Sequence, residues 1–223
     1  MAQIEIEIKS LLGERAKAEL LKERLKESGF DLDKVKKSSQ LNHYFTYKDL
    51  EKFKEVFQEI VKNKENFLNI LNKGKDFSIR TRESNGGKVI LVIKASLGED
   101  SSQNGVSRME FEEEMNITLN ELDKKLLDCG LVYQAKWSRE REEYRNGKMA
   151  VCLDKNAGYG YLAEFEVVTE EESEIEKVKE SLLSFMTQMG FEELKQDRLE
   201  RMFDFYNKNW PDYYGTEKIF TIL

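Results

Sequence analysis

The feature that most constrains this chain is an alternation of apolar and charged residues that recurs in several segments. In its first instance, three isoleucines occupy the even positions of residues 4–9, and two glutamates and a lysine occupy the odd positions. Successive side chains of a β-strand point to opposite faces, so this segment predicts a strand with one apolar face and one charged face. A similar alternation returns at 77–82, 107–115, 138–145, 151–154 and 162–168. A sheet built from such strands has one face of ionisable side chains.

A Glu-x-Glu pair occurs on three of these predicted strands, at residues 5 and 7, 110 and 112, and 164 and 166. Each strand is followed by a predicted helix that ends in a glycine and an apolar residue, namely Gly29-Phe30, Gly130-Leu131 and Gly190-Phe191. Glycine often terminates a helix because it adopts the left-handed conformation without strain. Three occurrences of one strand–helix unit predict a symmetric or pseudo-symmetric sheet.

Hydrophobic periodicity predicts helices over 12–28, 48–72, 119–129 and 171–189. Further strands are expected near 42–47, 77–83, 88–95, 131–145 and 148–154. Asn85-Gly86-Gly87 lies between two predicted strands and is a strong hairpin signal, whereas 98–105 is expected to be a charged loop. No linker or shift of composition interrupts the chain, which predicts a single domain.

Composition narrows the functional classes. The formal net charge of −7 argues against a general nucleic-acid binder, and no apolar run is long enough to cross a bilayer. The N-terminus lacks a signal-peptide core, and Cys129 and Cys152 form no disulfide or metal framework, so we expect a cytoplasmic protein. His43 is the only histidine, so a bound metal needs carboxylate ligands, which favours Mg²⁺ or Mn²⁺. A homodimer is an open alternative, because symmetric dimers are common.

The charged faces of the predicted strands together hold seven acidic and seven basic residues. The acids are Glu5, Glu7, Glu110, Glu112, Asp154, Glu164 and Glu166, and the bases are Lys9, Arg80, Arg82, Lys94, Arg108, Arg139 and Arg141. One explanation is an antiparallel sheet with a solvated, salt-bridged outer face. The other is a barrel with the charges inside and helices over its apolar outer face. Most of the bases are arginine, whose planar guanidinium fits phosphate oxygens, but the residues alone leave both explanations open.

The order of these residues resembles the CYTH superfamily, the triphosphate tunnel metalloenzymes, over roughly residues 3–203. The matching elements are Glu5-x-Glu7-x-Lys9, Arg80-x-Arg82, Lys94 at the end of the next strand, Arg139 with Arg141, Asp154, and Glu164-x-Glu166. The family includes thiamine triphosphatases, inorganic triphosphatases and class IV adenylyl cyclases. The resemblance implies an α+β fold in which a closed eight-stranded antiparallel β-barrel forms a tunnel with a charged interior and flanking helices.

The resemblance also implies roles for individual residues. The expected ligands of Mg²⁺ or Mn²⁺ are Glu5, Glu7, Asp154, Glu164 and Glu166. The expected triphosphate contacts are Lys9, Arg80, Arg82, Lys94, Arg108, Arg139 and Arg141. The expected catalytic residues are Glu5, Glu7, Lys9, Arg80, Arg82 and Lys94, whereas the roles of Glu110 and Glu112 are open. Crowded carboxylates repel one another unless a cation lies among them, and a basic wall complements the charge of a triphosphate.

The first functional hypothesis is a divalent-metal-dependent hydrolase of inorganic triphosphate, thiamine triphosphate or a nucleoside triphosphate. In this reaction a metal-activated water attacks the terminal phosphoryl group. The alternative is a class IV adenylyl cyclase, which converts ATP to cyclic AMP and pyrophosphate. A third class is a non-catalytic binder of polyphosphates or nucleotides, which would not need the metal carboxylates. His43, Tyr44 and Tyr47 either stack on an organic ring or belong to the strand's core.

Three segments depart from the family pattern. Residues 48–75 are longer than a minimal member needs and are expected to be a helical insertion in a domain at 1–207. Residues 208–223 are expected to be a C-terminal tail packed on that domain. In place of the family's Ser-Tyr motif the chain has Asp197-Arg198-Leu199, which leaves a contribution from Lys195 or Arg198 open.

Overall fold

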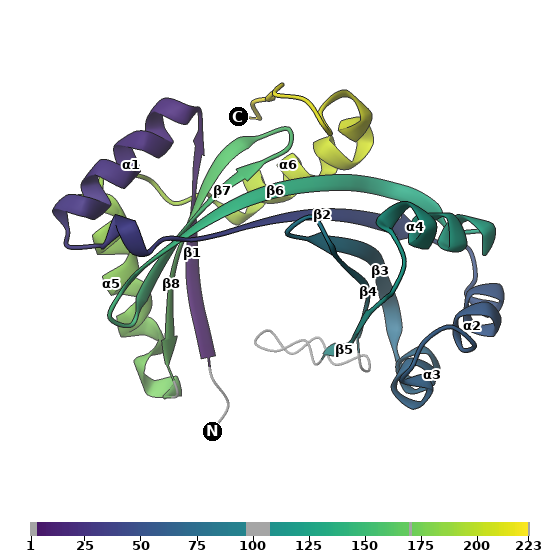
Figure 1. The fold of residues 1–223 in the computed structure, drawn as a ribbon. Coiled ribbons are helices and arrows are strands. Elements are labelled where there is room, and N and C mark those ends of the chain that lie inside the picture. Colours follow the sequence, from purple (N-terminus) through teal and green to yellow (C-terminus); the bar gives the residue numbers. More distant parts are fainter. Residues whose placement is uncertain (1–3, 97–107, 170, 223) are drawn as a thin grey trace. The chain divides into compact units, whose positions relative to one another are not determined.

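The computed structural model describes residues 4–96, 108–169 and 171–222 (Figure 1). The loop expected at 98–105 and the side chains of Glu5 and Arg108 lie outside this description. The strands are β1 (Ile4–Gly13), β2 (Lys36–Thr46), β3 (Lys75–Ser84), β4 (Lys88–Ser96), β5 (Arg108–Glu114), β6 (Val132–Asn146), β7 (Met149–Asn156) and β8 (Gly160–Thr169). The α-helices are α1 (Arg15–Glu27), α2 (Glu51–Phe57), α3 (Lys64–Lys73), α4 (Leu119–Asp128), α5 (Ile175–Gln188) and α6 (Gln196–Asn209). Short 3₁₀ helices are η1 (Leu32–Lys34), η2 (Glu172–Glu174) and η3 (Trp210–Asp212).

The strands form an eight-stranded antiparallel sheet in the order β1-β8-β7-β6-β2-β3-β4-β5. The predicted α+β class and the eight antiparallel strands are therefore confirmed. Apolar residues face each other across the ladders, as Ile8 faces Phe165 and Ile79 faces Ile93. Within the described residues no ladder joins β1 to β5, so closure of the sheet into a barrel stays a prediction.

The chain divides into two compact units, one formed by residues 1–39 and 138–223 and the other by residues 40–137. Each unit has its own hydrophobic core. Strands β2 and β6 contribute residues to both units. The domain expected over 1–207 stays a prediction.

In the first unit, α1 and α5 cover the apolar face of β1, β7 and β8 (Figure 1). Ile6 and Ile8 are buried in this core, so the alternation at the start of the chain marks a strand with one buried face. The strand β1 runs farther than predicted, and the helix begins at Arg15 rather than at residue 12. Leu12, which fits a helical pattern equally well, is instead buried on the apolar face of β1, close to an irregularity in the β1–β8 ladder.

The repeated glycine–apolar pairs have a common physical cause. Gly29, Gly130 and Gly190 all have left-handed φ angles, of 85°, 90° and 76°. The backbone N–H of the next residue then donates back into the helix: Phe30 to Leu25, Leu131 to Leu126, and Phe191 to Met186, at 3.0–3.2 Å. This is the Schellman arrangement, which satisfies carbonyls at a helix end and buries the apolar residue that follows. The repeat in the sequence therefore encodes how α1, α4 and α5 end.

In the second unit, α2, α3 and α4 pack on the apolar face of β3, β4 and β5. The single helix predicted over 48–72 is wrong, because two helices occupy this segment and are separated at residues 58–63. Asn63 caps α3 by accepting a hydrogen bond from the N–H of Asn66 at 3.1 Å. The carboxylate of Glu113 on β5 accepts hydrogen bonds from the N–H groups of Lys62 and Asn63, at 2.6 and 2.9 Å. These contacts provide acceptors for backbone donors at the break.

Helix α6 was not predicted, although Leu199, Met202 and Tyr206 recur at helical spacing and are buried. The C-terminal segment returns across the turn between β7 and β8, where the N–H of Phe220 donates to the carbonyl of Gly158 at 2.7 Å. The ring of Phe220 lies 4.7 Å from that of Phe205 in α6. Among the described helices, none has the length and apolar character required for a transmembrane span.

Candidate functional site

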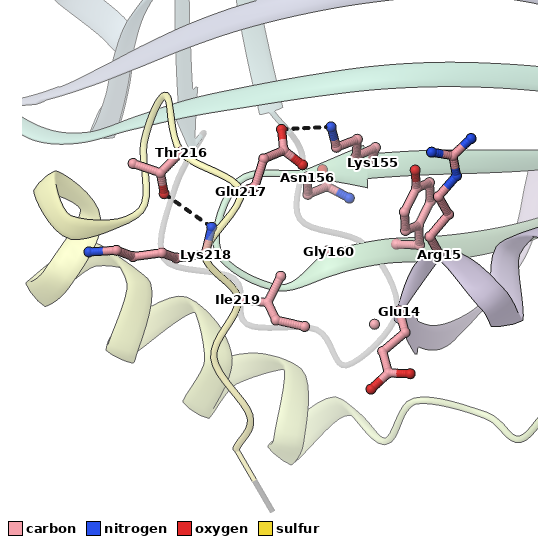
Figure 2. A pocket seen from close by; sticks show the side chains of 11 residues that line it. Glu14, Arg15, Lys155, Asn156, Gly160, Thr216, Glu217, Lys218 and Ile219 are labelled. Atoms are coloured by element: carbon pink, nitrogen blue, oxygen red, sulfur yellow. Dashed lines mark hydrogen bonds and ion pairs between the residues drawn. The ribbon is translucent and has the colours of Figure 1, made fainter.

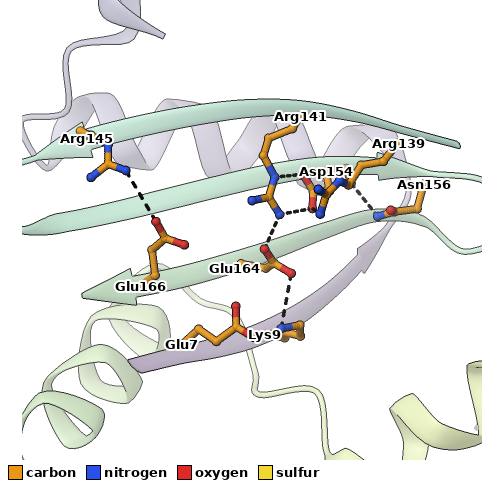
Figure 3. Close-up of polar contacts among 9 residues, drawn as sticks. All are labelled: Glu7, Lys9, Arg139, Arg141, Arg145, Asp154, Asn156, Glu164 and Glu166. Atoms are coloured by element: carbon orange, nitrogen blue, oxygen red, sulfur yellow. Dashed lines mark hydrogen bonds and ion pairs between the residues drawn. The ribbon is translucent and has the colours of Figure 1, made fainter. Parts of the chain in front are cut away.

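The charged side chains of the first unit lie on one face of four strands (Figure 3). The opposite face carries Ile8, Val151 and Phe165, which pack against α1 and α5. Strand alternation therefore directs the charged side chains away from the helices. The charged face includes Glu7, Lys9, Arg139, Arg141, Arg145, Asp154, Glu164 and Glu166, and also Glu143, which pairs with Arg145.

Arg141 on β6 is the centre of a buried ion-pair network. Its Nε and Nη2 donate to the two carboxylate oxygens of Asp154, both at 2.6 Å, and Nη2 also pairs with Glu164. The side chain of Asp154 is only 1% exposed, and Arg139 approaches it from 3.4 Å. Burial alone would lower the pKa of Arg141, but the hydrogen bond and charge of Asp154, together with the charge of Glu164, raise it well above its usual range. The network therefore holds a permanently charged guanidinium in a fixed orientation.

Lys9 on β1 lies between two carboxylates. Its ammonium group donates to Glu7 and lies 3.4 Å from Glu164, its register partner on β8. Burial would lower the pKa of Lys9, but its hydrogen bond to Glu7 and the charge of Glu164 outweigh this effect, so the pKa is raised. Burial would likewise raise the pKa of Glu164, but the charges of Lys9 and Arg141 lower it. Both groups are therefore charged at neutral pH.

Glu7 and Glu166 are direct partners across the β1–β8 ladder. Like charges placed directly opposite each other destabilise a sheet unless a cation compensates them. Arg145 reaches Glu166 at 3.8 Å, and Lys9 pairs with Glu7. Paired carboxylate oxygens are the donors that a hard divalent cation prefers, so this pair fits such an ion. Among the described side chains no cluster of three acids forms a metal site, and the side chain of Glu5 is not among them.

Cys152 also lies on this face of β7, opposite Glu164 in the register. It is buried, and burial raises the pKa of its thiol to about 12, assisted by the charges of Glu166 and Asp154. The thiol is therefore neutral at physiological pH, and it lacks the thiolate character of a nucleophile.

The second unit has its own charged side chains on β3, β4 and β5. Arg80 donates from Nη1 to the hydroxyl of Tyr44 at 2.7 Å, and its guanidinium lies 5.4 Å from the centre of the Tyr44 ring. The Nε of Arg80 is buried and has no hydrogen-bond partner among the described residues. A buried donor without an acceptor is rare in proteins and is expected where a ligand supplies the acceptor.

The neighbouring charges are paired with one another. Arg82 donates from Nε to Asn42 at 3.1 Å and lies 3.2 Å from Glu112. Lys94 lies 2.9 Å from Glu110. Burial would raise the pKa of Glu110, but the hydrogen bond and charge of Lys94 lower it. Glu110 and Glu112 therefore hold basic groups of this unit in place.

His43 points to the other face of β2 and belongs to a buried hydrogen-bonded cluster. Its Nδ1 lies 2.6 Å from Asp123 of α4, which also accepts hydrogen bonds from Thr81 at 2.6 Å and Tyr133 at 2.7 Å. His43 and Asp123 are both buried. The only histidine is thus a core residue. This agrees with the hypothesis that it belongs to the core of its strand and not with stacking on an organic ring.

A cavity of about 300 Å³ in the first unit lies beside the C-terminal segment (Figure 2). Its wall includes Arg15, Lys155 and Glu217, of which Lys155 and Glu217 form an ion pair at 2.9 Å. Gly160 lies so close to Gly13 that a Cβ atom would meet the Gly13 carbonyl oxygen at 2.1 Å. The close approach of these two glycines shapes the floor of this cavity.

The structure thus places the predicted residues in two groups. Glu7, Lys9, Arg139, Arg141, Asp154, Glu164 and Glu166 share the charged face of the first unit, and Arg80, Arg82, Lys94, Glu110 and Glu112 lie in the second. The side chains of Glu5 and Arg108 are not described. Sequence reasoning missed Arg145 and Tyr44 as members of these groups. Arg145 continues the alternation of Arg139 and Arg141 on β6, so the sequence pattern could have indicated it. Tyr44 joins the second group as the register partner of Arg80, and strand pairing cannot be read from alternation.

Comparison with known proteins gives a consistent result. The CYTH domain sequence model matches residues 3–199 of the chain. The search of curated proteins gave no match. The solved PH1819 protein of Pyrococcus horikoshii is 21% identical, with a TM-score of 0.51 over 86% of this chain and 94% of that one. A candidate adenylate cyclase of Vibrio parahaemolyticus is 13% identical, with a TM-score of 0.53 over 92% of this chain and 99% of that one. At these identities the two structures show a shared fold.

Proposed function

Because the chain belongs to the CYTH domain family, which includes triphosphatases and adenylate cyclases, we propose that it is a metal-dependent hydrolase of triphosphate-containing substrates. The closed eight-stranded tunnel implied by the family is part of this proposal. The observation that carries the proposal is the buried Nε of Arg80, which has no hydrogen-bond partner among the residues that the structure describes and lies two residues from Arg82. Arginine with a free donor is suited to phosphate oxygens, which accept several charge-assisted hydrogen bonds.

The charged face of the first unit has candidate phosphate-binding groups of its own. The contact of Arg141 with Asp154 uses Nε and Nη2, so we assign its Nη1 to a phosphate oxygen. Asp154 and Glu164 fix the orientation of this guanidinium before substrate arrives, which lowers the entropic cost of binding. Lys9 is held by Glu7 and Glu164 and is assigned a second phosphate oxygen. Arg139 is assigned a similar role.

The opposed pair of Glu7 and Glu166 is assigned to the divalent cation, with Glu5 as a further ligand. Glu164, a metal ligand in the sequence-based prediction, pairs through one oxygen with Lys9 and through the other with Arg141, so it is assigned to positioning these two bases. When bound, Mg²⁺ or Mn²⁺ neutralises phosphate charge and makes a nearby water more acidic, which suits attack on the terminal phosphoryl group. Asp154 is assigned to positioning Arg141 rather than to the metal, because Arg141 hydrogen-bonds both of its oxygens.

The test is a product assay on the purified chain with Mg²⁺ or Mn²⁺ and with inorganic triphosphate, thiamine triphosphate or ATP. We expect free phosphate from at least one substrate, lost on removal of the metal and in Glu7→Gln. Glu23→Gln on the exposed side of α1 is the matched control and should keep full activity. Cyclic AMP with pyrophosphate would identify the cyclase instead. No metal-dependent turnover of any of the three would contradict both and favour a binding protein.

A further inference from the structure

A cavity of about 490 Å³ lies in the second unit, beside Arg80, one of the proposed phosphate-binding arginines. Its wall includes Tyr44 and Thr46 of β2, Phe77 and Ser78 of β3, and Gln134 of β6. Its volume is within the range of small-molecule sites in proteins. None of the described residues that line it carries a formal charge, which contrasts with the charged residues next to it.

The cavity adjoins Arg80 through shared residues. Tyr44 is both a wall of the cavity and the register partner and hydrogen-bond acceptor of Arg80. Ser78 precedes Arg80 by two residues on β3, so its side chain points to the same face about 7 Å farther along the strand. A substrate whose phosphate is bound by Arg80 would therefore place its next chemical group within reach of the cavity.

The side chains that line the cavity distinguish between the chemical groups that the candidate substrates would place in it. The hydroxyls of Thr46 and Ser78 and the amide of Gln134 offer both donors and acceptors, and Tyr44 and Phe77 offer aromatic surface. A cationic ring would gain no ion pair from this lining, and it would be repelled by the Arg80 guanidinium, which already lies over the Tyr44 ring. A bare triphosphate would leave the cavity unfilled.

We infer that this cavity takes the uncharged heteroaromatic base of a nucleoside triphosphate. The inference rests on the proposed function and deepens it, because it ranks nucleoside triphosphates above thiamine triphosphate and inorganic triphosphate. Recognition then combines phosphate contacts from Arg80 and Arg82 with two contacts to a neutral ring. Thr46, Ser78 and Gln134 supply hydrogen bonds, and Tyr44 and Phe77 supply aromatic surface.

The test is calorimetric binding in Mg²⁺ of three non-hydrolysable β,γ-methylene ligands, namely the analogues of ATP, of bare triphosphate and of thiamine triphosphate. We expect the ATP analogue to bind about tenfold or more tightly than the bare analogue, since base stacking and hydrogen bonding add affinity. Gln134→Leu should weaken the ATP analogue about tenfold, whereas Gln188→Leu on the exposed face of α5 should leave its affinity unchanged. Ser78→Asp, which adds an acid, should shift preference toward the thiamine triphosphate analogue.

Two results would overturn the inference. One is equal affinity of the wild-type chain for the ATP analogue and the bare analogue, and the other is tighter binding of the thiamine triphosphate analogue than of the ATP analogue. Because these measurements need no turnover, they are separate from the product assay. A chain that prefers the ATP analogue but releases no phosphate would contradict the proposed hydrolase and leave the nucleotide site standing.

Discussion

Asp154→Asn tests whether the buried ion-pair network organises the charged face of the first unit. The substitution keeps the size of the side chain and removes the charge that Arg141 contacts through two hydrogen bonds of 2.6 Å. Removing one partner of a buried ion pair typically costs about 3–5 kcal/mol, because the other charge is left uncompensated. Arg141 keeps Glu164 as a partner and is 20% exposed, so we expect a loss of about 2–3 kcal/mol in the free energy of unfolding.

The assay is urea unfolding at pH 7, with Asp197→Asn as the matched control. Asp197 also pairs with an arginine, Arg201, at 2.7 Å, but on the exposed surface of α6, so its substitution should leave the unfolding midpoint unchanged. Arg141→Met combined with Asp154→Asn should cost less than the sum of the two single substitutions, because the double variant removes both charges of the pair and each single variant leaves one of them uncompensated. Additive losses, or a loss for Asp154→Asn no larger than the control's, would refute the reasoning.

Three further predictions follow from local contacts. Glu142 accepts hydrogen bonds from Lys22, Lys37 and Tyr144. Burial would raise the pKa of Glu142, but these hydrogen bonds lower it to about 2. The contribution of Glu142 to stability is therefore present above about pH 4.5 and is lost toward pH 2. The difference in unfolding midpoint between wild type and Glu142→Gln should shrink over that interval. A difference that stays constant would contradict this prediction. Gly158→Ala would place a Cβ atom 2.6 Å from the Tyr206 ring of α6 and 2.9 Å from the Phe220 ring, and should loosen the C-terminal segment and speed its proteolysis. Gly215→Ala is its control, with a similar φ but open space around it; equal effects of the two would show that backbone strain alone acts. Arg80→Lys should lower kcat/KM for a triphosphate by about tenfold, because lysine lacks the planar fork, and unchanged kinetics would remove Arg80 from the phosphate site.

The strands and their charged faces were accessible from the sequence because alternation is a local property. Ile8 and Phe165 point to one face and Glu7 and Glu164 to the other simply because side chains of a strand alternate. The ends of α1, α4 and α5 were accessible for a similar reason, since a left-handed glycine followed by a buried apolar residue is a local signal. The break between α2 and α3 was not, because Glu113, which accepts two backbone hydrogen bonds there, is distant in sequence.

In the candidate site, too, some features follow from the local sequence and others depend on contacts between distant residues. The sequence by itself determined which residues are charged and which of them share a face of each strand. Only the tertiary structure decided which charges meet. Asp154, a predicted metal ligand, is hydrogen-bonded through both oxygens to Arg141, whereas Glu7 faces Glu166 across a ladder. Arg80 has Tyr44 as its partner and a neutral cavity beside it, which no spacing in the chain indicates. Pairing and cavity shape depend on strand register, which long-range contacts fix and local alternation leaves open.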